Sequence, residues 1–214
     1  MGLGGANVVL AARSLEKLEQ ICSDIKKSGG SALAVPTDIT QENDCKNLIN
    51  LTIQNFHTID MLILNAGVSM WAPFEEIEDI SFFNDIMNVN YMGSVYCVHA
   101  ALPELKKSKG KIVSITTAQA IIGFAHHAGY SASKHALHGF LETLDMELEG
   151  AVSFMNTYLG WIKGTSLREN AYGADGKKIG QAGHSHDHNT IELNPCTDKI
   201  IQAIQSGKKT VYIP

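Results

Sequence analysis

Short apolar runs alternate with longer segments of helical period along most of the chain, and this alternation limits the folds that the sequence can adopt. The expected strands are residues 7–12, 32–35, 59–64, 111–116, 152–158 and 209–213. The expected helices are residues 14–28, 40–56, 81–106, 127–148 and 197–206. Strands separated by helices are typical of βαβ units, which build parallel sheets. We therefore expect residues 1–214 to form one α/β domain around a doubly wound parallel sheet.

The alternation stops between Gly160 and Pro195, where glycines and polar residues dominate. A connection of this length is typical of a substrate loop or lid, or of a disordered insert. Three histidines at alternate positions, residues 184, 186 and 188, raise the question of a metal site. Their surroundings are rich in glycine, and catalytic zinc ligands normally come from separate elements. We interpret them as part of a solvated loop and assign no metal site.

Charge and composition exclude several functional classes. The formal net charge is −5, which disfavours nucleic acid as a partner because such proteins carry a basic surface. The four cysteines form no C-x-x-C pair, so we expect reduced thiols. No apolar run approaches the roughly 18 residues of a transmembrane helix, and no signal peptide is evident. We expect the chain as written to be intracellular and soluble, without membrane contact.

Tyr130 and Lys134 are the most informative pair of residues. Four positions apart on a helix, they project from the same face. An ammonium group beside a phenol favours the phenolate, so we expect Lys134 to lower the pKa of Tyr130 and make it a usable acid or base. By itself the Tyr-x-x-x-Lys spacing also occurs by chance on amphipathic helices.

Other polar residues follow the predicted strands. Thr117 stands thirteen residues before Tyr130, Asn90 stands forty before it, and Asn65-Ala66-Gly67 follows an earlier strand. Ligands of parallel sheets bind outside the carboxyl ends of the strands, so these residues are expected to converge on one rim. His126, His127, Trp71 and Trp161 are near this rim in sequence. The two histidines could line a substrate pocket or stand at an exposed helix start. The two tryptophans could form a wall of the substrate site or pack in the core.

These motifs make the chain resemble a short-chain dehydrogenase/reductase over essentially its whole length. The matching segments are Asn65-Ala66-Gly67, Val89-Asn90, Gly110–Ser114 and Tyr130-x-x-Ser133-Lys134. Residues 60–65, 101–106 and 130–140 resemble the 11β-hydroxysteroid dehydrogenase branch, and residues 74–96 resemble 3-ketosphinganine reductases. The resemblance implies a Rossmann-like fold and an oxidoreductase that interconverts a carbonyl and a secondary alcohol. Its substrate would be small and apolar, of lipid or steroid type.

The resemblance also implies roles for single residues. Tyr130 would exchange a proton with the substrate oxygen, and Thr117 would hydrogen-bond that oxygen. Lys134 would hold the nicotinamide ribose, and Asn90 would hold a water in a proton relay. Threonine replaces the usual serine at 117, and its extra methyl group crowds the pocket.

Cofactor binding is expected at both ends of the sequence. The resemblance implies that Asp38 meets the adenine, that Asn65-Ala66-Gly67 lies along the cofactor, and that Gly160 and Ile162 belong to the turn that holds the nicotinamide. Arg13-Ser14 follows the first predicted strand, at the position where such folds recognise the ribose of the adenosine. Arginine suits a 2′-phosphate, so NADP(H) is favoured over NAD(H); an ordinary surface arginine is the alternative.

The first residues depart from the family pattern. Relatives begin with a strand and a Gly-rich phosphate turn, whereas Gly2, Gly4 and Gly5 precede a strand here. We therefore expect a shortened form of a longer enzyme, lacking the first strand and the Gly-rich turn. The branches that the chain resembles often sit on the endoplasmic reticulum membrane through N-terminal segments, so the resemblance makes this a possible location for the longer form. The alternative function is an inactive protein that binds no dinucleotide and acts through oligomer contacts. Helices 81–106 and 127–148 match those that join relatives into homo-oligomers.

Overall fold

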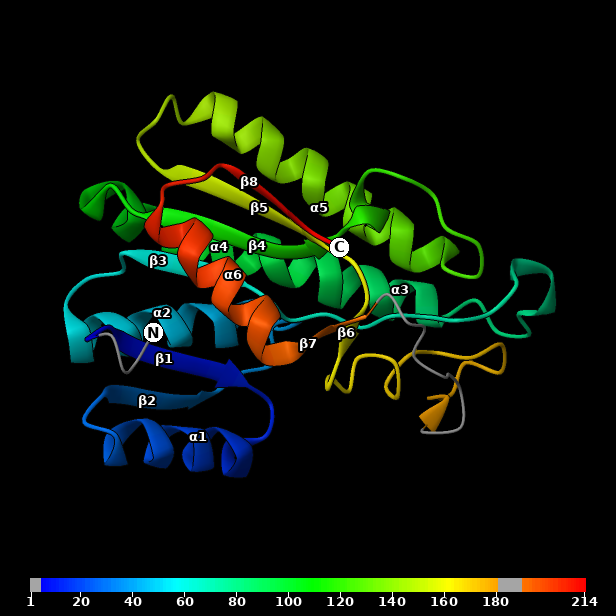
Figure 1. The fold of residues 1–214 in the computed structure, drawn as a ribbon, viewed down its shortest axis with the longest axis horizontal. Coiled ribbons are helices and arrows are strands. Elements are labelled where there is room, and N and C mark those ends of the chain that lie inside the picture. The colour runs from blue at the N-terminus through cyan, green and yellow to red at the C-terminus, as the bar shows by residue number, and fades with distance from the viewer. Residues whose placement is uncertain (1–4, 181–189) are drawn as a thin grey trace. The chain divides into compact units, whose positions relative to one another are not determined.

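The computed structural model describes residues 5–180 and 190–214, and its contacts divide the chain into two compact units (Figure 1). The first unit contains Met1–Leu62 and Gly93–Gly110. The second contains Ile63–Met92 and Lys111–Pro214. Parallel strands joined by helical crossovers confirm the α/β class predicted from the alternating pattern.

The first unit is built on a parallel pair of strands. β1 (Asn7–Ala12) lies beside β2 (Ser31–Pro36), with Asn7 opposite Ser31 and Ala12 opposite Pro36. The connecting helix α1 (Leu15–Lys27) begins after Ser14 and ends before Gly29, whose φ of +81° suits glycine. Helices α2 (Glu42–Phe56) and α4 (Gly93–Ser108) pack together. Their contact buries Cys45 and Cys97 with the two Sγ atoms 3.5 Å apart.

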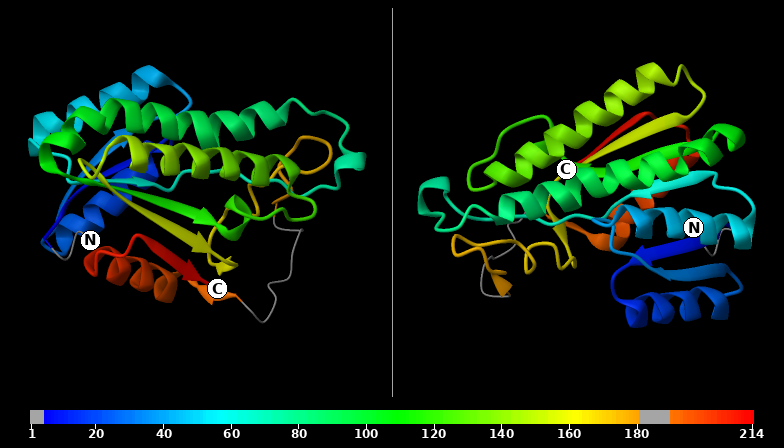
Figure 2. Two further views of the ribbon diagram at one scale, coloured as in Figure 1. Left: turned by 90° about the horizontal axis from the view of Figure 1, so that it is seen from above. Right: turned by 180° about the vertical axis from the view of Figure 1, so that it is seen from behind.

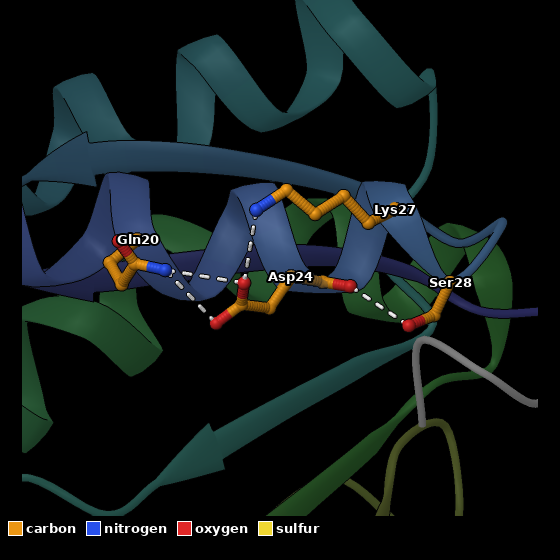
Figure 3. Close-up of polar contacts among 4 residues, drawn as sticks. All are labelled: Gln20, Asp24, Lys27 and Ser28. Atoms are coloured by element: carbon orange, nitrogen blue, oxygen red, sulfur yellow. Dashed lines mark hydrogen bonds and ion pairs between the residues drawn. The ribbon is translucent and has the colours of Figure 1, made fainter.

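Polar contacts around Asp24 link side chains along the exposed surface of α1 (Figure 3). Its carboxylate accepts from the Gln20 amide at 3.2 Å and lies 3.7 Å from the Lys27 ammonium. The Ser28 hydroxyl donates to the Asp24 carbonyl at 3.0 Å, at the end of the helix. These exposed i, i+3 and i, i+4 contacts each stabilise the helix only slightly.

The larger sheet has the strand order β3-β4-β5-β8, and all of it except the first two residues of β3 belongs to the second unit. The bounds are β3 (Met61–Leu64), β4 (Lys111–Thr117), β5 (Ser153–Leu159) and β8 (Thr210–Ile213). β4, β5 and β8 are parallel, and α5 (Ala128–Glu147) and α6 (Leu193–Gln205) cover opposite faces (Figure 2). One buried cluster of this unit contains Met70, Ala72, Phe82, Ile86 and Tyr130.

The helix expected over residues 81–106 is not continuous. It consists of α3 (Phe82–Met87), a π-helical segment η3 (Asn88–Met92) and α4. π-helical turns are local interruptions, often at functional sites. Here the interruption contains Asn90, whose side chain is completely buried and bonded to groups far away in sequence. Tertiary hydrogen bonds of this kind leave no trace in helical periodicity.

The segment after β5 has more structure than its composition suggests. β6 (Ile162–Lys163) pairs with β7 (Ile191–Glu192), a short parallel bridge that the sequence pattern did not predict. Tyr172 is bonded to residues 69–71: Tyr172 N donates to Ser69 O at 2.9 Å, and Trp71 N donates to Tyr172 O at 2.8 Å. The histidines at 184, 186 and 188 fall outside the described residues. Over the described ranges, we find no helix with the length and apolar character that crossing a membrane requires.

Candidate active site

The site begins with Tyr130 and Lys134, one turn apart near the start of α5. Both side chains are buried, with 7% and 4% of their surfaces exposed. The Lys134 Nζ atom lies 5.8 Å from the centroid of the Tyr130 ring. The helical spacing therefore brings the two groups together as the sequence predicts.

Burial controls the ionisation of this pair. Desolvation raises the pKa of Tyr130 to about 12 and lowers the pKa of Lys134 to about 8. Both shifts favour the neutral form, because a charge loses its hydration when it is buried. The expectation that the lysine lowers the pKa of the tyrosine is thus not met in the protein alone, where desolvation raises that pKa.

Asn90 connects the loop after β3 to α5. Its Oδ1 accepts from the Val68 amide at 2.8 Å, and its Nδ2 donates to the Val68 carbonyl at 2.9 Å. The same Nδ2 donates to the Ser133 hydroxyl at 2.9 Å, and Ser133 donates to the Tyr130 carbonyl at 2.7 Å. Asn90 therefore fixes the backbone next to Gly67 relative to the turn of helix that carries Tyr130.

The Asn65-Ala66-Gly67 segment follows β3 directly. Asn65 and Ala66 are exposed, and Gly67 is half-buried beside the lysine. A Cβ atom on Gly67 would lie 3.2 Å from Asn90 Oδ1 and 3.4 Å from Lys134 Nζ. Glycine here keeps open the space in front of the ammonium group.

Thr117 is the last residue of β4, and its half-buried hydroxyl accepts from the Gln119 amide at 3.4 Å. Ser114 is already bonded across the sheet, since its hydroxyl donates to Asn156 Oδ1 at 2.6 Å. Successive strand residues face opposite sides of a sheet, so Thr116 points away from Thr117. Thr117 therefore remains the candidate for the hydroxyl that would hydrogen-bond the substrate oxygen.

Gly160 and Ile162 follow β5 on the path to β6. The Gly160 amide donates to Ile213 O at 2.7 Å, and a Cβ there would lie 2.9 Å from the Pro214 carbonyl carbon. Close approach of β8 thus requires glycine at 160, whatever its role toward a ligand. Ile162 is half-buried and pairs with Ile191.

Arg13, Ser14 and Asp38 belong to the first unit, at the ends of β1 and β2. Arg13 and Ser14 are exposed, and the Thr37 amide donates to Ala12 O at 2.9 Å, which joins the two strand ends. Hydrogen bonds from Thr40 lower the pKa of Asp38, and the charge of Arg13 adds to this effect. The structure brings Arg13 and Asp38 into one electrostatic neighbourhood.

Two features of the site had no definite role assigned from the sequence. Ser133, which links Asn90 to Tyr130, is completely buried; its position three residues after Tyr130 was the available signal. The second feature is an aromatic cluster beside Tyr130. The His127 ring lies 6.0 Å from Tyr130, 4.8 Å from Trp71 and 6.5 Å from Trp161, measured between ring centroids. His127 is buried in this cluster, and His126 is exposed.

The parallel α/β fold and the buried Tyr130–Lys134 pair place the protein in the class of α/β proteins with a Tyr-x-x-x-Lys site. Residues 1–175 match the family model described as short chain dehydrogenase. The chain belongs to the short-chain dehydrogenase family of enzymes.

Two curated relatives come from Arabidopsis thaliana. 11-beta-hydroxysteroid dehydrogenase-like 2 is 39% identical over 175 residues, which cover 80% of this chain and 57% of the relative. 11-beta-hydroxysteroid dehydrogenase 1A is 34% identical over 219 residues, which cover 98% of this chain and 62% of the relative. The chain thus spans somewhat more than half the length of these two proteins.

Solved structures show the same fold. An alcohol dehydrogenase from the archaeon Thermococcus sibiricus, complexed with 5-hydroxy-NADP, superposes with a TM-score of 0.83 over 99% of this chain and 86% of its own, at 18% identity. A short-chain dehydrogenase/reductase of unknown function from Caenorhabditis elegans, solved with cofactor, gives a TM-score of 0.70 at 26% identity. That match covers 76% of this chain and 63% of the other.

Proposed function

We propose that this protein is an NADP(H)-dependent oxidoreductase that interconverts a carbonyl and a secondary alcohol on an apolar substrate. The observation that carries the proposal is the buried arrangement of Tyr130, Lys134 and Asn90 within one compact unit. Such an arrangement suits proton transfer to a carbonyl oxygen.

The residues fit a dinucleotide on two grounds. The absent side chain at Gly67 leaves space beside the Lys134 ammonium, on the loop that the family uses for cofactor. Arg13 offers an exposed guanidinium at the end of β1, where a 2′-phosphate is read. Lys134 and the 65–67 backbone would hold the nicotinamide half, and Arg13 and Asp38 the adenosine half. The cofactor, when bound, supplies or accepts the hydride.

The chain's own residues would manage the proton. A Tyr130 hydroxyl with a raised pKa is neutral at physiological pH and so can donate a proton to the substrate oxygen. A cationic Lys134 would stabilise the phenolate that remains. Asn90 is assigned to hold a water that returns the proton, in addition to positioning Val68 and Ser133. Thr117 would orient the substrate oxygen.

The aromatic rim supports an apolar substrate. His127 lies next to Tyr130, and Trp71 and Trp161 contact His127; the three residues come from the loops after three different strands. The two Arabidopsis relatives are described as 11-beta-hydroxysteroid dehydrogenase-like 2 and 11-beta-hydroxysteroid dehydrogenase 1A. Flat polycyclic ketones are therefore the substrates to test first.

We also infer a homo-oligomer that uses the 81–106 and 127–148 segments. Met146, near the end of α5, has 67% of its surface exposed, which a subunit contact would cover.

The test is turnover of a steroid ketone with NADPH by the wild-type chain, Tyr130→Phe and a control, Tyr212→Phe. Tyr212 is exposed and stacks on Tyr158, so its hydroxyl should not affect turnover. Tyr130→Phe should lose at least about a hundredfold in kcat, within the usual range for a general acid, and keep its circular dichroism spectrum. Equal turnover by Tyr130→Phe would refute the role of the tyrosine. A wild-type chain that binds no NADPH would favour the alternative of an inactive protein.

A further inference from the structure

The aromatic cluster continues from Tyr130 along a line that ends in a positive charge. Beyond His127 stands Trp161, whose ring is also in contact with Phe124, at 6.1 Å, and with Trp71, at 6.3 Å. The guanidinium carbon of Arg168 lies 4.0 Å from the centroid of the Trp161 ring. This distance is within the range of a cation–π contact. The order of contacts is therefore Tyr130, His127, Trp161 and Arg168.

The charge of Arg168 has no carboxylate partner among residues 5–180 and 190–214. Other cations of the same segment do have one: Lys163 lies 3.1 Å from Glu192, and Lys177 lies 3.9 Å from Asp175. Arg168 is half-buried, and desolvation lowers its pKa. A partly desolvated guanidinium without a counter-charge favours an anionic ligand, since its donors match an oxyanion in two-point geometry.

The turn that carries Arg168 is held by main-chain hydrogen bonds. The Ala171 amide donates to Arg168 O at 3.0 Å, and the Gly180 amide donates to Glu169 O at 3.0 Å. Tyr172 is bonded in both directions to the 69–71 segment, which also carries Trp71. The guanidinium and the aromatic rings are therefore parts of one bonded frame, as a ligand site with fixed dimensions requires.

We propose that Arg168 binds an anionic group, a carboxylate or a similar oxyanion, on a substrate whose apolar body lies along Trp161 and His127 with its carbonyl at Tyr130. This rests on the proposed function, and it narrows the substrate class from apolar carbonyl compounds to apolar keto acids. Trp161 would contact the apolar body on one side of its ring system and hold the guanidinium in place.

Two other roles of Arg168 predict different behaviour. If Arg168 only supports Trp161, its loss should weaken the binding of charged and uncharged ligands equally. If it binds a cofactor phosphate, its loss should weaken NADPH binding. An anion site for the substrate predicts a loss that is selective for charged substrates, with NADPH affinity unchanged.

The experiment measures the dissociation constants of 4-benzoylbenzoate and of its methyl ester by calorimetry, with and without NADP⁺. These probes share a diaryl ketone and differ at the carboxyl group, which is charged in the acid and neutral, with one added methyl group, in the ester. The wild-type chain is compared with Arg168→Gln, Arg168→Lys and the control Lys163→Gln. Lys163 is a cation of the same segment whose charge is already paired.

We expect the wild-type chain to bind the acid more tightly than the ester. Arg168→Gln should weaken acid binding roughly 10- to 100-fold, the range for a lost charge-assisted hydrogen bond, and leave ester binding within about twofold. Arg168→Lys should recover part of the preference, and Lys163→Gln should keep all of it. Equal losses for both probes, or no preference for the acid in the wild type, would overturn the proposal.

Failure of the proposed function gives a different result. Tyr130→Phe removes the assigned proton donor and leaves Arg168 in place, so acid preference should persist in that variant. Acid preference without turnover by the wild type would contradict the oxidoreductase proposal only. Turnover of both probes without any preference would contradict the anion site only.

Discussion

Asn90 has a buried amide, and hydrogen bonds of this amide join it to residues 22 and 43 positions away in sequence. Asn90→Ala leaves the amide and carbonyl of Val68 and the hydroxyl of Ser133 without this partner. We expect the free energy of unfolding to fall by about 3 kcal/mol, since each buried orphan costs roughly 1–3 kcal/mol. Urea unfolding measures the change. The control Asn55→Ala removes an exposed amide bonded only to Leu51 O and should change stability by less than about 0.5 kcal/mol. Equal effects of the two substitutions would contradict the connecting role of Asn90.

Lys134 gives the protein a pH-dependent stability with a definite sign. Its pKa is lowered from 10.5 to about 8, so between these values the unfolded chain binds more protons and stability rises with pH. Below that window the folded state must bury a charge. Lys134→Met keeps the apolar stem and removes the charge, so the variant should be more stable than wild type near pH 7. The gain is on the order of 3 kcal/mol, from roughly 1.4 kcal/mol per pKa unit, and it should disappear near pH 10.5.

The measurement is chemical unfolding of both proteins across this pH range. Lys106→Met, at an exposed position of α4, serves as the control and should show no pH-dependent difference. Tyr130 acts in the opposite direction at higher pH: its raised pKa lets stability fall between about 10 and 12 in both proteins, so its effect cancels in the comparison. A constant difference at every pH would show that packing, and not the buried charge, controls the stability.

The residues of the site differ in how well the sequence predicts them. Tyr130 and Lys134 are four positions apart on a helix, a spacing that local geometry interprets correctly. Ser133 and Val68 take their places through contacts with Asn90, which periodicity does not encode. Arg168 and Trp161 meet across an irregular turn, where no repeat relates sequence separation to distance.

At the scale of elements, two glycines differ in how much space surrounds them: Gly110 is tightly packed, and Gly139 faces open space. A Cβ on Gly110 would lie 2.8 Å from Leu105 Cδ2 and 2.9 Å from Asp60 O, so Gly110→Ala should destabilise the protein by about 1–3 kcal/mol. Gly139 is exposed on α5 with nothing within 4 Å of the corresponding position, so Gly139→Ala should stabilise by roughly 0.5–1 kcal/mol. Thermal unfolding of the two variants should show shifts of opposite sign. Shifts of the same sign would contradict this difference in packing.

Strands were easier to predict than helix continuity. β4 and β5 are largely buried short segments rich in apolar and β-branched residues, and each was recovered to within one residue at either end. The 81–106 segment has an equally clear helical pattern, yet its π-helical segment depends on bonds to Val68 and Ser133. β6 and β7 are two residues each, too short to produce any pattern.

At the scale of the whole molecule, cofactor binding should appear as added stability. A ligand that binds only the folded chain at about 100 times its Kd raises the free energy of unfolding by about 2.7 kcal/mol. We expect NADPH to raise the melting temperature more than NADH does, because Arg13 offers a partner for the 2′-phosphate. Arg13→Gln should remove the difference and preserve the NADH shift. Scanning fluorimetry provides the measurement, and equal shifts for the two nucleotides in the wild type would contradict a preference for NADP(H).

The main-chain bonds between residues 69–71 and Tyr172 have a consequence for how this protein could acquire new substrates. These bonds use backbone atoms that every residue type except proline supplies, so exchanging the side chains of Trp71, Trp161 or Arg168 for other non-proline residues leaves the bonds in place. Under the proposed function, ligand preference and chemistry would therefore be encoded in separate sets of residues. A few substitutions in this frame should change which ketone is accepted while Tyr130 and Lys134 continue to perform the same reaction, which makes the 161–172 turn the place to begin directed evolution.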